Sequence, residues 1–467
     1  MEIDFYKPIC RYLVIPLWAK WEKSRYLQYY EEQKRFQYLD RNYIQADQFK
    51  RLKQLINHAY ENCSFYKSYY SSRDIHPEDI RQWSDFGKLP IITKEMVRKN
   101  QREMVARNIS HDRLVPGKTS GSTGKPMEFF IDEESTQNQR ASELLTNEWA
   151  GYQLGGKIFS MFGISASRVK RNRVKRYLRR KLLTRSNNLS TLRLTEESMT
   201  EFYKKLKITS IPFLYGYAHT LFLFAEFLEK NNYLDVNAGG IISGGMVLHN
   251  YQKEKIGKVF NCRVINRYGC EELGTIACEC DRQEGLHVNS YTKYVEVINE
   301  NGKRAKPGEV GKLVITDLTN YGMPFIRYNI EDMGVASDKI CSCGRTLPLL
   351  AGIEGRESDF VITPDGVMVS GISLTDNFGA NIPGVVQLQI VQDKIDHINI
   401  RIVRDPSFNQ ESMVIIGRLS EKFFGDKMRF SCEFIDKIPF EASGKIRFVI
   451  SELERNNVKP LNRKIVQ

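Results

Sequence analysis

The chain lacks several features that would assign it to common classes of protein. No apolar run reaches the roughly 20 residues that a membrane-spanning helix needs. The longest such run near the N-terminus covers only Tyr12 to Ala19, contains Pro16 and follows acidic Glu2 and Asp4, so it does not resemble a signal peptide. The sequence also has no internal repeat and no low-complexity tract. With a charged fraction of 27%, these absences predict a soluble, cytoplasmic protein.

The cysteines lack the spread of a disulfide framework. Four of the nine fall in two tight pairs, Cys278/Cys280 and Cys341/Cys343, and such pairs in a reducing compartment more often bind metal. His287 follows Cys280 at a spacing of Cys-x6-His. Three thiolates and one imidazole suit a closed tetrahedral zinc site, which we predict from Cys280, His287, Cys341 and Cys343. Cys278 is a spare thiol for the same site, and a set of unrelated buried thiols is the alternative.

A net charge of +13 favours an anionic partner, such as a nucleotide, coenzyme A, anionic lipid or nucleic acid. The excess is concentrated in Arg168–Arg185, which holds ten basic residues and no acidic one. A solvated helix face or loop is one interpretation of this run. A membrane surface or a phosphate-bearing substrate is the other. We do not expect nucleic acid, because no recognition motif accompanies the run.

The length of 467 residues predicts a large domain followed by a smaller one. Residues 1–75 carry aromatic and basic residues at helical spacing, which favours helices packed on a core over an amphipathic segment on a membrane. From about residue 80 to 355, apolar runs alternate with helical patterns, which predicts an α/β sheet. We expect strands at 158–164, 213–217, 238–245, 263–269 and 312–318, and a helix at 217–231.

The pattern changes after Gly355. Residues 385–403 alternate like a β-hairpin, 409–425 have a helical pattern, and 428–435 alternate again. We therefore expect a compact α+β module at the C-terminus, joined to the preceding domain by a charged segment.

The sharpest local motif is the sequence TSGSTGKP. Its glycines allow close approach of the backbone to an anion, and its hydroxyls and amides can donate to phosphate oxygens. It is not a Walker A loop, because Pro126 stands where Ser or Thr would hold magnesium. A polar Ser/Gly loop is the alternative. The candidate phosphate-binding residues are Thr119, Ser120, Gly121, Ser122, Thr123, Gly124 and Lys125.

Five further stretches follow in a fixed order. They are Ser243-Gly244-Gly245, Tyr268-Gly269-Cys270-Glu271-Glu272, Arg327-Tyr328-Asn329-Ile330-Glu331-Asp332, Gly355-Arg356-Glu357-Ser358-Asp359 and Ser443-Gly444-Lys445-Ile446-Arg447. Together with TSGSTGKP, this series resembles the motifs of the adenylate-forming (acyl-CoA synthetase and ligase) superfamily over residues 80 to 450. The stretches ECDRQEGLHVNS and CSCGRTLP resemble the branch that contains phenylacetate–CoA ligase and related proteins of capsular polysaccharide biosynthesis.

The resemblance implies a role for each matched residue. Tyr268 would stack on adenine beside the Gly244-Gly245 loop, and Asp332 would accept hydrogen bonds from the ribose hydroxyls. Arg356 would reach ribose or phosphate. Glu272 would hold Mg²⁺, since a hard cation prefers a carboxylate. Lys445 would stabilise the charge that develops on the α-phosphate and the carboxylate.

Three departures from the superfamily pattern leave the catalytic efficiency and the class of substrate open. Glu271 replaces the usual Ser/Thr beside the magnesium glutamate, Asn329-Ile330-Glu331 replaces Arg-Thr-Gly, and Ser358 occupies a position that is often acidic.

The resemblance implies a large α/β domain, residues 1–355 with a helical lead-in at 1–75, and a small mobile α+β domain, residues 356–467. Rotation about residues 356–359 would bring Lys445 in for acyl-AMP formation and withdraw it for transfer. The zinc site would be structural, and would join the loop after Glu272 to the segment before this hinge.

We therefore expect an ATP-dependent ligase that activates a small carboxylic acid and transfers it to coenzyme A or to a pantetheine carrier. Transfer to an amine or hydroxyl in polysaccharide assembly is one alternative. A non-catalytic scaffold docked on membranes through residues 168–185 is another, against which intact Glu272 and Lys445 argue. A peripheral membrane contact and a homodimer both stay open.

Overall fold

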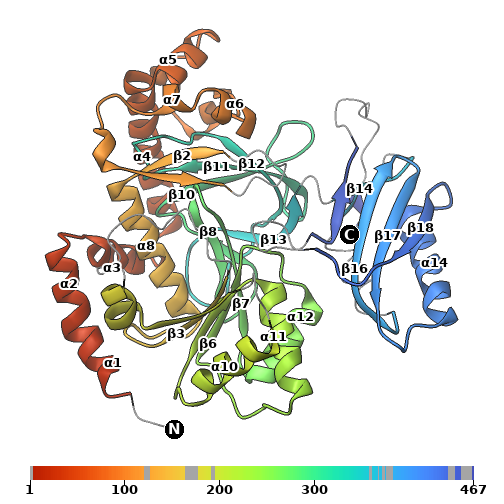
Figure 1. Cartoon of the computed structure of the whole chain (residues 1–467). Coiled ribbons are helices and arrows are strands. Elements are labelled where there is room, and N and C mark those ends of the chain that lie inside the picture. The colour runs from red at the N-terminus through yellow and green to blue at the C-terminus, as the bar shows by residue number, and fades with distance from the viewer. Residues whose placement is uncertain are drawn as a thin grey trace.

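The computed structural model describes residues 4–119, 127–162, 177–190, 195–356, 360–365, 368–370, 374, 382–439, 447–453 and 465–466. Its largest element is an eleven-stranded mixed sheet, with strands in the order β10-β11-β12-β13-β9-β8-β7-β6-β5-β3-β4. Helices lie against this sheet, and a separate C-terminal unit stands beside it (Figure 1). The α/β fold class predicted from the sequence is confirmed.

One half of the sheet is parallel. Its strands pair in parallel with one another. Every residue of β6 is buried, which explains why this strand is a short apolar run in the sequence. The connecting helices bury Leu221, Phe224 and Ile256 in a common core with Phe159 and Ile241. The bounds are β3 Ile158–Phe162, β4 Ser186–Ser190, α10 Glu196–Lys207, β5 Phe213–Gly216, α11 Ala218–Lys230, β6 Gly240–Gly244, α12 Asn250–Phe260 and β7 Val264–Cys270. The strands and the helix predicted for this half are confirmed within a few residues at their ends.

The other half of the sheet is antiparallel. The change occurs at β7, which pairs in parallel with β6 and antiparallel with β8. Of these strands, the sequence predicted only β11. The bounds are β8 Gly274–Glu279, β9 Leu286–Val288, β10 Lys293–Ile298, β11 Val310–Asp317, β12 Tyr328–Ala336 and β13 Leu349–Arg356.

The N-terminal segment is helical, as predicted. Asp40 caps α4 by accepting from the Asn42 and Tyr43 amides, and α3 packs against α8, where the Ser142 hydroxyl donates to Gln33 Oε1 over 2.9 Å. The bounds are α1 Tyr6–Ile9, a π-helical turn Cys10–Val14, α2 Ile15–Trp21, α3 Tyr26–Phe36, α4 Arg41–Asn62, α5 Ser64–Ser71, α6 Lys94–Lys99, α7 Gln101–Met104 and α8 Glu133–Trp149, with 3₁₀ turns at Pro77–Asp79, Trp83–Lys88 and His111–Arg113. Among the described residues, no helix combines the length and apolar character needed to cross a bilayer.

A two-stranded hairpin precedes α8. Strands β1 (Leu114–Lys118) and β2 (Glu128–Asp132) pair antiparallel, with Lys118 opposite Glu128. The hairpin was not predicted from the sequence. It is the element that carries the TSGSTGKP loop.

The C-terminal unit has its own sheets and its own core. A four-stranded sheet in the order β18-β17-β16-β19 packs on α14, and buries Ile390, Ile400 and Ile416 together. It stands to one side of the large sheet (Figure 1). The predicted hairpin, helix and last strand are confirmed. The bounds are β14 Phe360–Ile362, β15 Met368–Ser370, β16 Val385–Lys394, β17 His397–Arg404, α14 Gln410–Phe424, β18 Arg429–Phe434, β19 Val449–Ser451 and β20 Ile465–Val466.

Candidate nucleotide site and metal centre

The two ends of the candidate phosphate-binding loop are joined by hydrogen bonds between Thr119 and Met127. The Thr119 amide donates to the Met127 carbonyl over 2.9 Å, and the Met127 amide donates to Thr119 Oγ1 over 3.0 Å. Ser120 to Lys125, the rest of the predicted loop, lie outside the described residues. Met127 Sδ lies 4.0 Å from the Tyr328 hydroxyl. The base of the loop is therefore next to the start of β12, which runs from Tyr328 to Ala336.

Glu272 lies just beyond β7 and is buried, with 1% of its surface exposed. The Tyr328 hydroxyl donates to Glu272 Oε1 over 3.1 Å. Burial and the nearby Glu272 carboxylate raise the pKa of Tyr328 well above its usual value, so this tyrosine stays a hydrogen-bond donor. Tyr328 thus holds one oxygen of the carboxylate in place.

Tyr268 and Asp332 form a second pair of the same kind. The Tyr268 hydroxyl donates to Asp332 Oδ2 over 2.6 Å, and burial together with the Asp332 charge raises the pKa of Tyr268 well above its usual value. Strands β7 and β12 are separated by β8, β9 and β13 in the sheet, so this contact requires the sheet to curve. Across β12 and β13, Asp332 pairs with Arg356. We call Tyr268, Glu272, Tyr328 and Asp332 the acid–tyrosine cluster.

The segment before Asp332 has an unusual backbone. Arg327 and Glu331 adopt positive φ angles of 48° and 70°, which are uncommon for residues other than glycine. Asn329 Oδ1 accepts from the Glu331 amide over 2.9 Å and supports this turn. Arg327 is fixed by Glu296, whose carboxylate it meets at 3.1 and 3.2 Å. The Asn329–Glu331 departure from the superfamily pattern therefore builds the turn that presents Asp332.

The predicted glycine loop lies at the carboxyl end of β6, next to β7. Gly244 pairs with Arg267, and a Cβ atom at Gly244 would lie 3.3 Å from the Arg267 carbonyl oxygen. Gly245 has a φ of 73°, which glycine adopts without strain. Ligands of open α/β sheets bind at this edge, where the strands end. The loop is therefore adjacent to the strand that carries Tyr268.

The chain is similar in sequence to known proteins along most of its length. The family described as "CapK C-terminal domain" matches residues 361–452. The chain is 26% identical to "Protein CapK" of Staphylococcus aureus over 447 residues, covering 94% of each chain. It is 24% identical to "Phenylacetate-coenzyme A ligase" of Escherichia coli (strain K12) over 328 residues, covering 68% of this chain and 72% of the relative.

The chain also superposes on a solved structure, that of 2-hydroxyisobutyryl-CoA ligase in the postadenylation state in complex with R3-HIB-AMP. The TM-score is 0.72 and the sequence identity is 17%. The superposition covers 91% of this chain and 92% of that one. The chain has the fold of the adenylate-forming ligases. The resemblance seen in its sequence motifs is thus confirmed.

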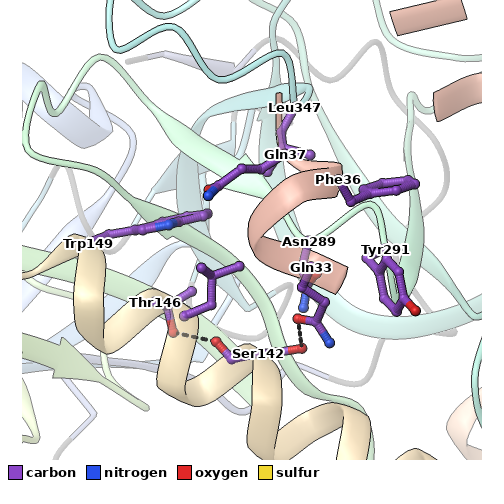
Figure 2. Close-up of a pocket in the computed structure, with 10 residues that line it drawn as sticks. Gln33, Phe36, Gln37, Ser142, Thr146, Trp149, Asn289, Tyr291 and Leu347 are labelled. Carbon is purple, nitrogen blue, oxygen red and sulfur yellow. Dashed lines mark hydrogen bonds between the residues drawn. The ribbon is translucent and has the colours of Figure 1, made fainter. Parts of the chain in front are cut away.

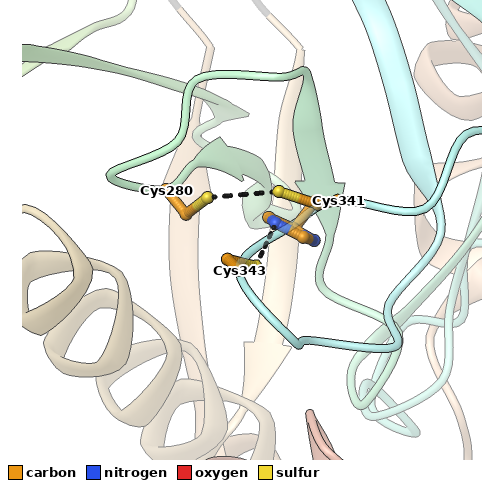
Figure 3. Close-up of side chains that lie close together, drawn as sticks. Cys280, Cys341 and Cys343 are labelled. Atoms are coloured by element: carbon orange, nitrogen blue, oxygen red, sulfur yellow. Dashed lines mark hydrogen bonds between the residues drawn. The ribbon is translucent and has the colours of Figure 1, made fainter.

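Four side chains predicted as metal ligands come together in this fold. One ligand atom from each of Cys280, His287, Cys341 and Cys343 lies within 4.8 Å of the others. The sulfurs of Cys280 and Cys341 are 3.6 Å apart, and Cys343 Sγ lies 3.4 Å from His287 Nε2 (Figure 3). A tetrahedral zinc ion with Zn–S bonds of about 2.3 Å would separate its sulfurs by about 3.8 Å. The donor set and its spacing fit zinc.

Some contacts around this Cys/His cluster favour ligation, whereas burial raises the pKa of Cys280 and Cys341. Backbone amides of Arg282 and Arg345 donate to the sulfurs of Cys280 and Cys343, each over 3.4 Å. Burial lowers the pKa of His287 to about 4, so its imidazole is neutral at pH 7, as a metal ligand must be. Burial opposes ionisation of Cys343, but the Arg345 amide and side chain outweigh it and lower the pKa of that thiol.

Cys278 does not join the cluster. It is fully buried in a different hydrophobic core, beside Ile265 and Leu347, and burial raises its pKa to about 12. The suggestion that Cys278 is a spare ligand finds no support in this position.

A small cavity lies near the Cys/His cluster, between α3 and α8 (Figure 2). Trp149 lines the cavity and also packs edge-on against His287, with ring centroids 5.7 Å apart. The cavity shares no residue with the acid–tyrosine cluster or the Cys/His cluster. The lining residues are Gln33, Phe36, Gln37, Ser142, Leu145, Thr146, Trp149, Asn289, Tyr291 and Leu347.

Besides Ser120–Lys125, two further predicted site residues lie wholly or partly outside the described residues. Lys445 is not among the described residues, and Arg356 is described by its backbone at the end of β13. Tyr328 is the contact that sequence reasoning missed. Its motif was recognised, but nothing in the spacing indicates that its hydroxyl meets a carboxylate 56 residues earlier.

Proposed function

We propose that the chain is an AMP-forming ligase that activates a carboxylic acid with ATP and transfers the acyl group to the thiol of coenzyme A. The observation that carries this proposal is the acid–tyrosine cluster. Its members come from two motifs about 60 residues apart, and they meet beside the base of the candidate phosphate-binding loop. Relatives named phenylacetate-coenzyme A ligase support the same reaction class.

The residues divide the first half-reaction between them. The substrate carboxylate attacks the α-phosphorus of ATP, the P–O bond to pyrophosphate breaks, and acyl-AMP forms. We assign Thr119–Lys125 to the phosphates, and Glu272, steadied by Tyr328, to the Mg²⁺ that neutralises them. Lys445 would supply positive charge at the reacting α-phosphate.

The nucleoside would occupy the other pair of the cluster. The ring of Tyr268 would stack on adenine beside Gly244 and Gly245. Asp332 would exchange the Tyr268 hydroxyl for the ribose hydroxyls, and Arg356 lies on the neighbouring strand. In the second half-reaction the thiol attacks the acyl carbon, the bond to AMP breaks, and the thiol proton is released.

We propose that the two half-reactions use two orientations of a C-terminal domain, residues 356–467, relative to residues 1–355. The separate sheets and separate core of the C-terminal unit support this division. Strand β13 ends at Arg356, where the rotation would begin.

Replacement of Lys445 by alanine tests the proposed reaction and its two steps. Pyrophosphate release with a panel of aryl, short aliphatic, hydroxy and amino acids should fall by roughly a hundredfold or more, since each 1.36 kcal/mol of lost stabilisation is tenfold in rate. Transfer from supplied acyl-AMP should stay largely intact. Lys394→Ala, an exposed lysine at the end of β16, is the matched control and should change neither step.

The outcomes separate the parts of the proposal. If Lys445→Ala slowed both steps equally with a normal melting temperature, the rotation mechanism would be wrong. If it slowed neither step, the assignment of adenylation itself would fail.

Transfer to an amine or hydroxyl in surface polysaccharide assembly is the second candidate function. The match to CapK extends over 94% of both chains and includes the C-terminal domain family, whereas the match to the E. coli coenzyme A ligase covers 68% of this chain. Pyrophosphate release that coenzyme A does not accelerate, and acyl-AMP that accumulates in its presence, would favour this candidate.

We also propose that Cys280, His287, Cys341 and Cys343 hold a structural zinc ion. All four positions would be protein ligands, which leaves no open position for catalysis. The site ties β8 and β9 to the segment before β13, because Cys280 follows β8 and His287 lies in β9 opposite Leu349. It therefore braces the strands behind the acid–tyrosine cluster.

A further inference from the structure

The first helix of the chain exposes a stripe of large apolar side chains. Residues Tyr6–Trp21 form one continuous helix, composed of α1, the π-helical turn and α2. Six large apolar side chains on or just before it are between 50% and 75% exposed, an unusual density for a surface that contacts only water. They are Phe5, Ile9, Tyr12, Leu13, Leu17 and Trp21.

The π-helical turn aligns this stripe. Five of the six residues are spaced four apart, and in a regular α-helix such a series drifts by about 40° at each step. The turn Cys10–Val14 adds one residue to the helix and reverses much of that drift. Pro16 lacks the amide that would bond the Tyr12 carbonyl, which gives a local reason for the irregular turn. The two halves of the stripe thus share one face.

The opposite face of the helix anchors it to the protein. Cys10, Ile15 and Ala19 are buried in one cluster with Tyr26 and Leu183. Because that cluster is packed, the exposed stripe belongs to a helix with a fixed orientation.

A second segment, distant in sequence, packs beside this helix and also exposes apolar side chains. Residues 177–184, the helical end of the basic run, meet the first helix where Cys10 Sγ contacts the Leu182 carbonyl at 3.2 Å. Arg185 binds Asp4 through two hydrogen bonds of 2.8 and 2.9 Å. Tyr177, Leu178 and Leu182 add exposed apolar area beside the helix.

Basic side chains border this apolar surface. Residues 4–25 and 177–185 together hold nine basic residues and two acidic ones. Both acidic residues already have cationic partners, since Asp4 binds Arg185 and Glu22 lies 3.9 Å from Arg140. The exposed basic residues are Arg11, Lys20, Lys23, Arg25, Arg180 and Lys181.

We propose that this surface, residues 5–25 with 177–182, docks the protein on an anionic lipid bilayer. A helix with one apolar face, bordered by lysine and arginine, lies in the headgroup region of such membranes. A second copy of the chain is a poorer partner, because a two-fold contact would bring the basic borders of both copies together. Helices α1 and α2 lie on the opposite side of the molecule from the C-terminal unit (Figure 1), so docking through them leaves that unit unobstructed.

Sedimentation of the full chain with vesicles tests the proposal. We expect binding to phosphatidylcholine vesicles that contain 30% phosphatidylglycerol, little binding to phosphatidylcholine alone, and weakening as salt rises. Arg180→Gln/Lys181→Gln should weaken binding by roughly thirtyfold, since each basic residue near the surface contributes about fivefold. Leu13→Gln/Leu17→Gln should weaken it at least as much.

Matched variants distinguish the effect of this surface from the effect of losing positive charge or an exposed apolar side chain elsewhere on the protein. Lys204→Gln/Lys205→Gln removes two exposed basic residues from α10, and Val414→Gln removes an exposed apolar residue from α14; neither should change binding. Equal binding to neutral and anionic vesicles, or equal loss in the α10 variant, would overturn the proposal. The proposal would also be overturned if light scattering showed that the wild-type protein is a dimer that does not bind vesicles, and that Leu13→Gln/Leu17→Gln is a monomer. Pyrophosphate release in solution is independent of every one of these outcomes.

Discussion

The Cys/His cluster and the acid–tyrosine cluster lie on the same sheet but are organised differently. In the Cys/His cluster, four potential ligands face one another at up to 4.8 Å, and two sulfurs also accept backbone amides. In the acid–tyrosine cluster, each carboxylate instead accepts a hydrogen bond from a tyrosine hydroxyl.

The difference indicates how each cluster is used. A set of thiolates and an imidazole that converge on one point is complete only with a metal, and metal binding then stabilises the fold. A carboxylate held by a hydroxyl is satisfied without a ligand and can exchange that hydroxyl for one on a substrate. We therefore expect the first cluster to control stability and the second to control turnover.

The largest effect should follow from breaking the Cys/His cluster. Cys341→Ser/Cys343→Ser should reduce zinc from about one ion per chain to none, and should lower the melting temperature by roughly 10 °C or more, because ligand loss removes metal-linked stability. Elemental analysis of protein purified without added metal, together with calorimetry, measures both quantities.

Cys278→Ala is the matched control for this prediction. It removes a buried thiol from the neighbouring core and should leave the zinc content at one ion per chain. Absence of zinc from the wild-type protein, with no change in the double serine variant, would reject the metal site.

The sequence predicted the Cys/His cluster because cysteine and histidine are chemically distinctive at any separation. It also predicted β3, β5, β6 and β7 in the parallel half of the sheet, since buried parallel strands are largely apolar runs. It missed β4, whose sequence SNNLS is mostly polar. The antiparallel strands escaped prediction because they are short or mixed in polarity: β9 has three residues, and β12 contains Asn329, Glu331 and Asp332.

Contacts that depend on the curvature of the sheet could not be predicted from the sequence. The pairing of Tyr328 with Glu272 depends on sheet curvature, which no local pattern encodes. The exposed stripe on the first helix is a similar case. The π-helical turn brings its residues closer to one face, whereas a regular helical wheel would show them drifting around the helix.

An intermediate effect should follow from removing one hydroxyl of the acid–tyrosine cluster. Tyr328→Phe leaves the Glu272 carboxylate without this donor, and a hydrogen bond to a charged group contributes about 1.5–3 kcal/mol. We expect the KM for magnesium–ATP in pyrophosphate release to rise by roughly tenfold, with zinc content unchanged.

Tyr66→Phe controls for the loss of any buried tyrosine hydroxyl. The Tyr66 hydroxyl donates to the Pro324 carbonyl over 2.7 Å, within the hydrophobic core. This variant should melt at a lower temperature with an unchanged KM. If Tyr328→Phe and Tyr66→Phe had the same kinetics, Tyr328 would have only a structural role.

The smallest effect should come from Tyr268→Phe, which tests whether the hydroxyl is exchangeable. The phenylalanine ring can still stack on adenine, and Asp332 loses only the donor that the ribose hydroxyls are proposed to replace. We expect ATP affinity, measured by calorimetry, to stay within about threefold of wild type or to tighten. Tyr268→Ala removes the stacking surface as well and should weaken binding by roughly tenfold, since stacking of a base on an aromatic ring contributes about 1–3 kcal/mol. A loss in Tyr268→Phe as large as that in Tyr268→Ala would mean that the hydroxyl itself binds the nucleotide. The exchange between Tyr268 and the ribose at Asp332 would then be wrong.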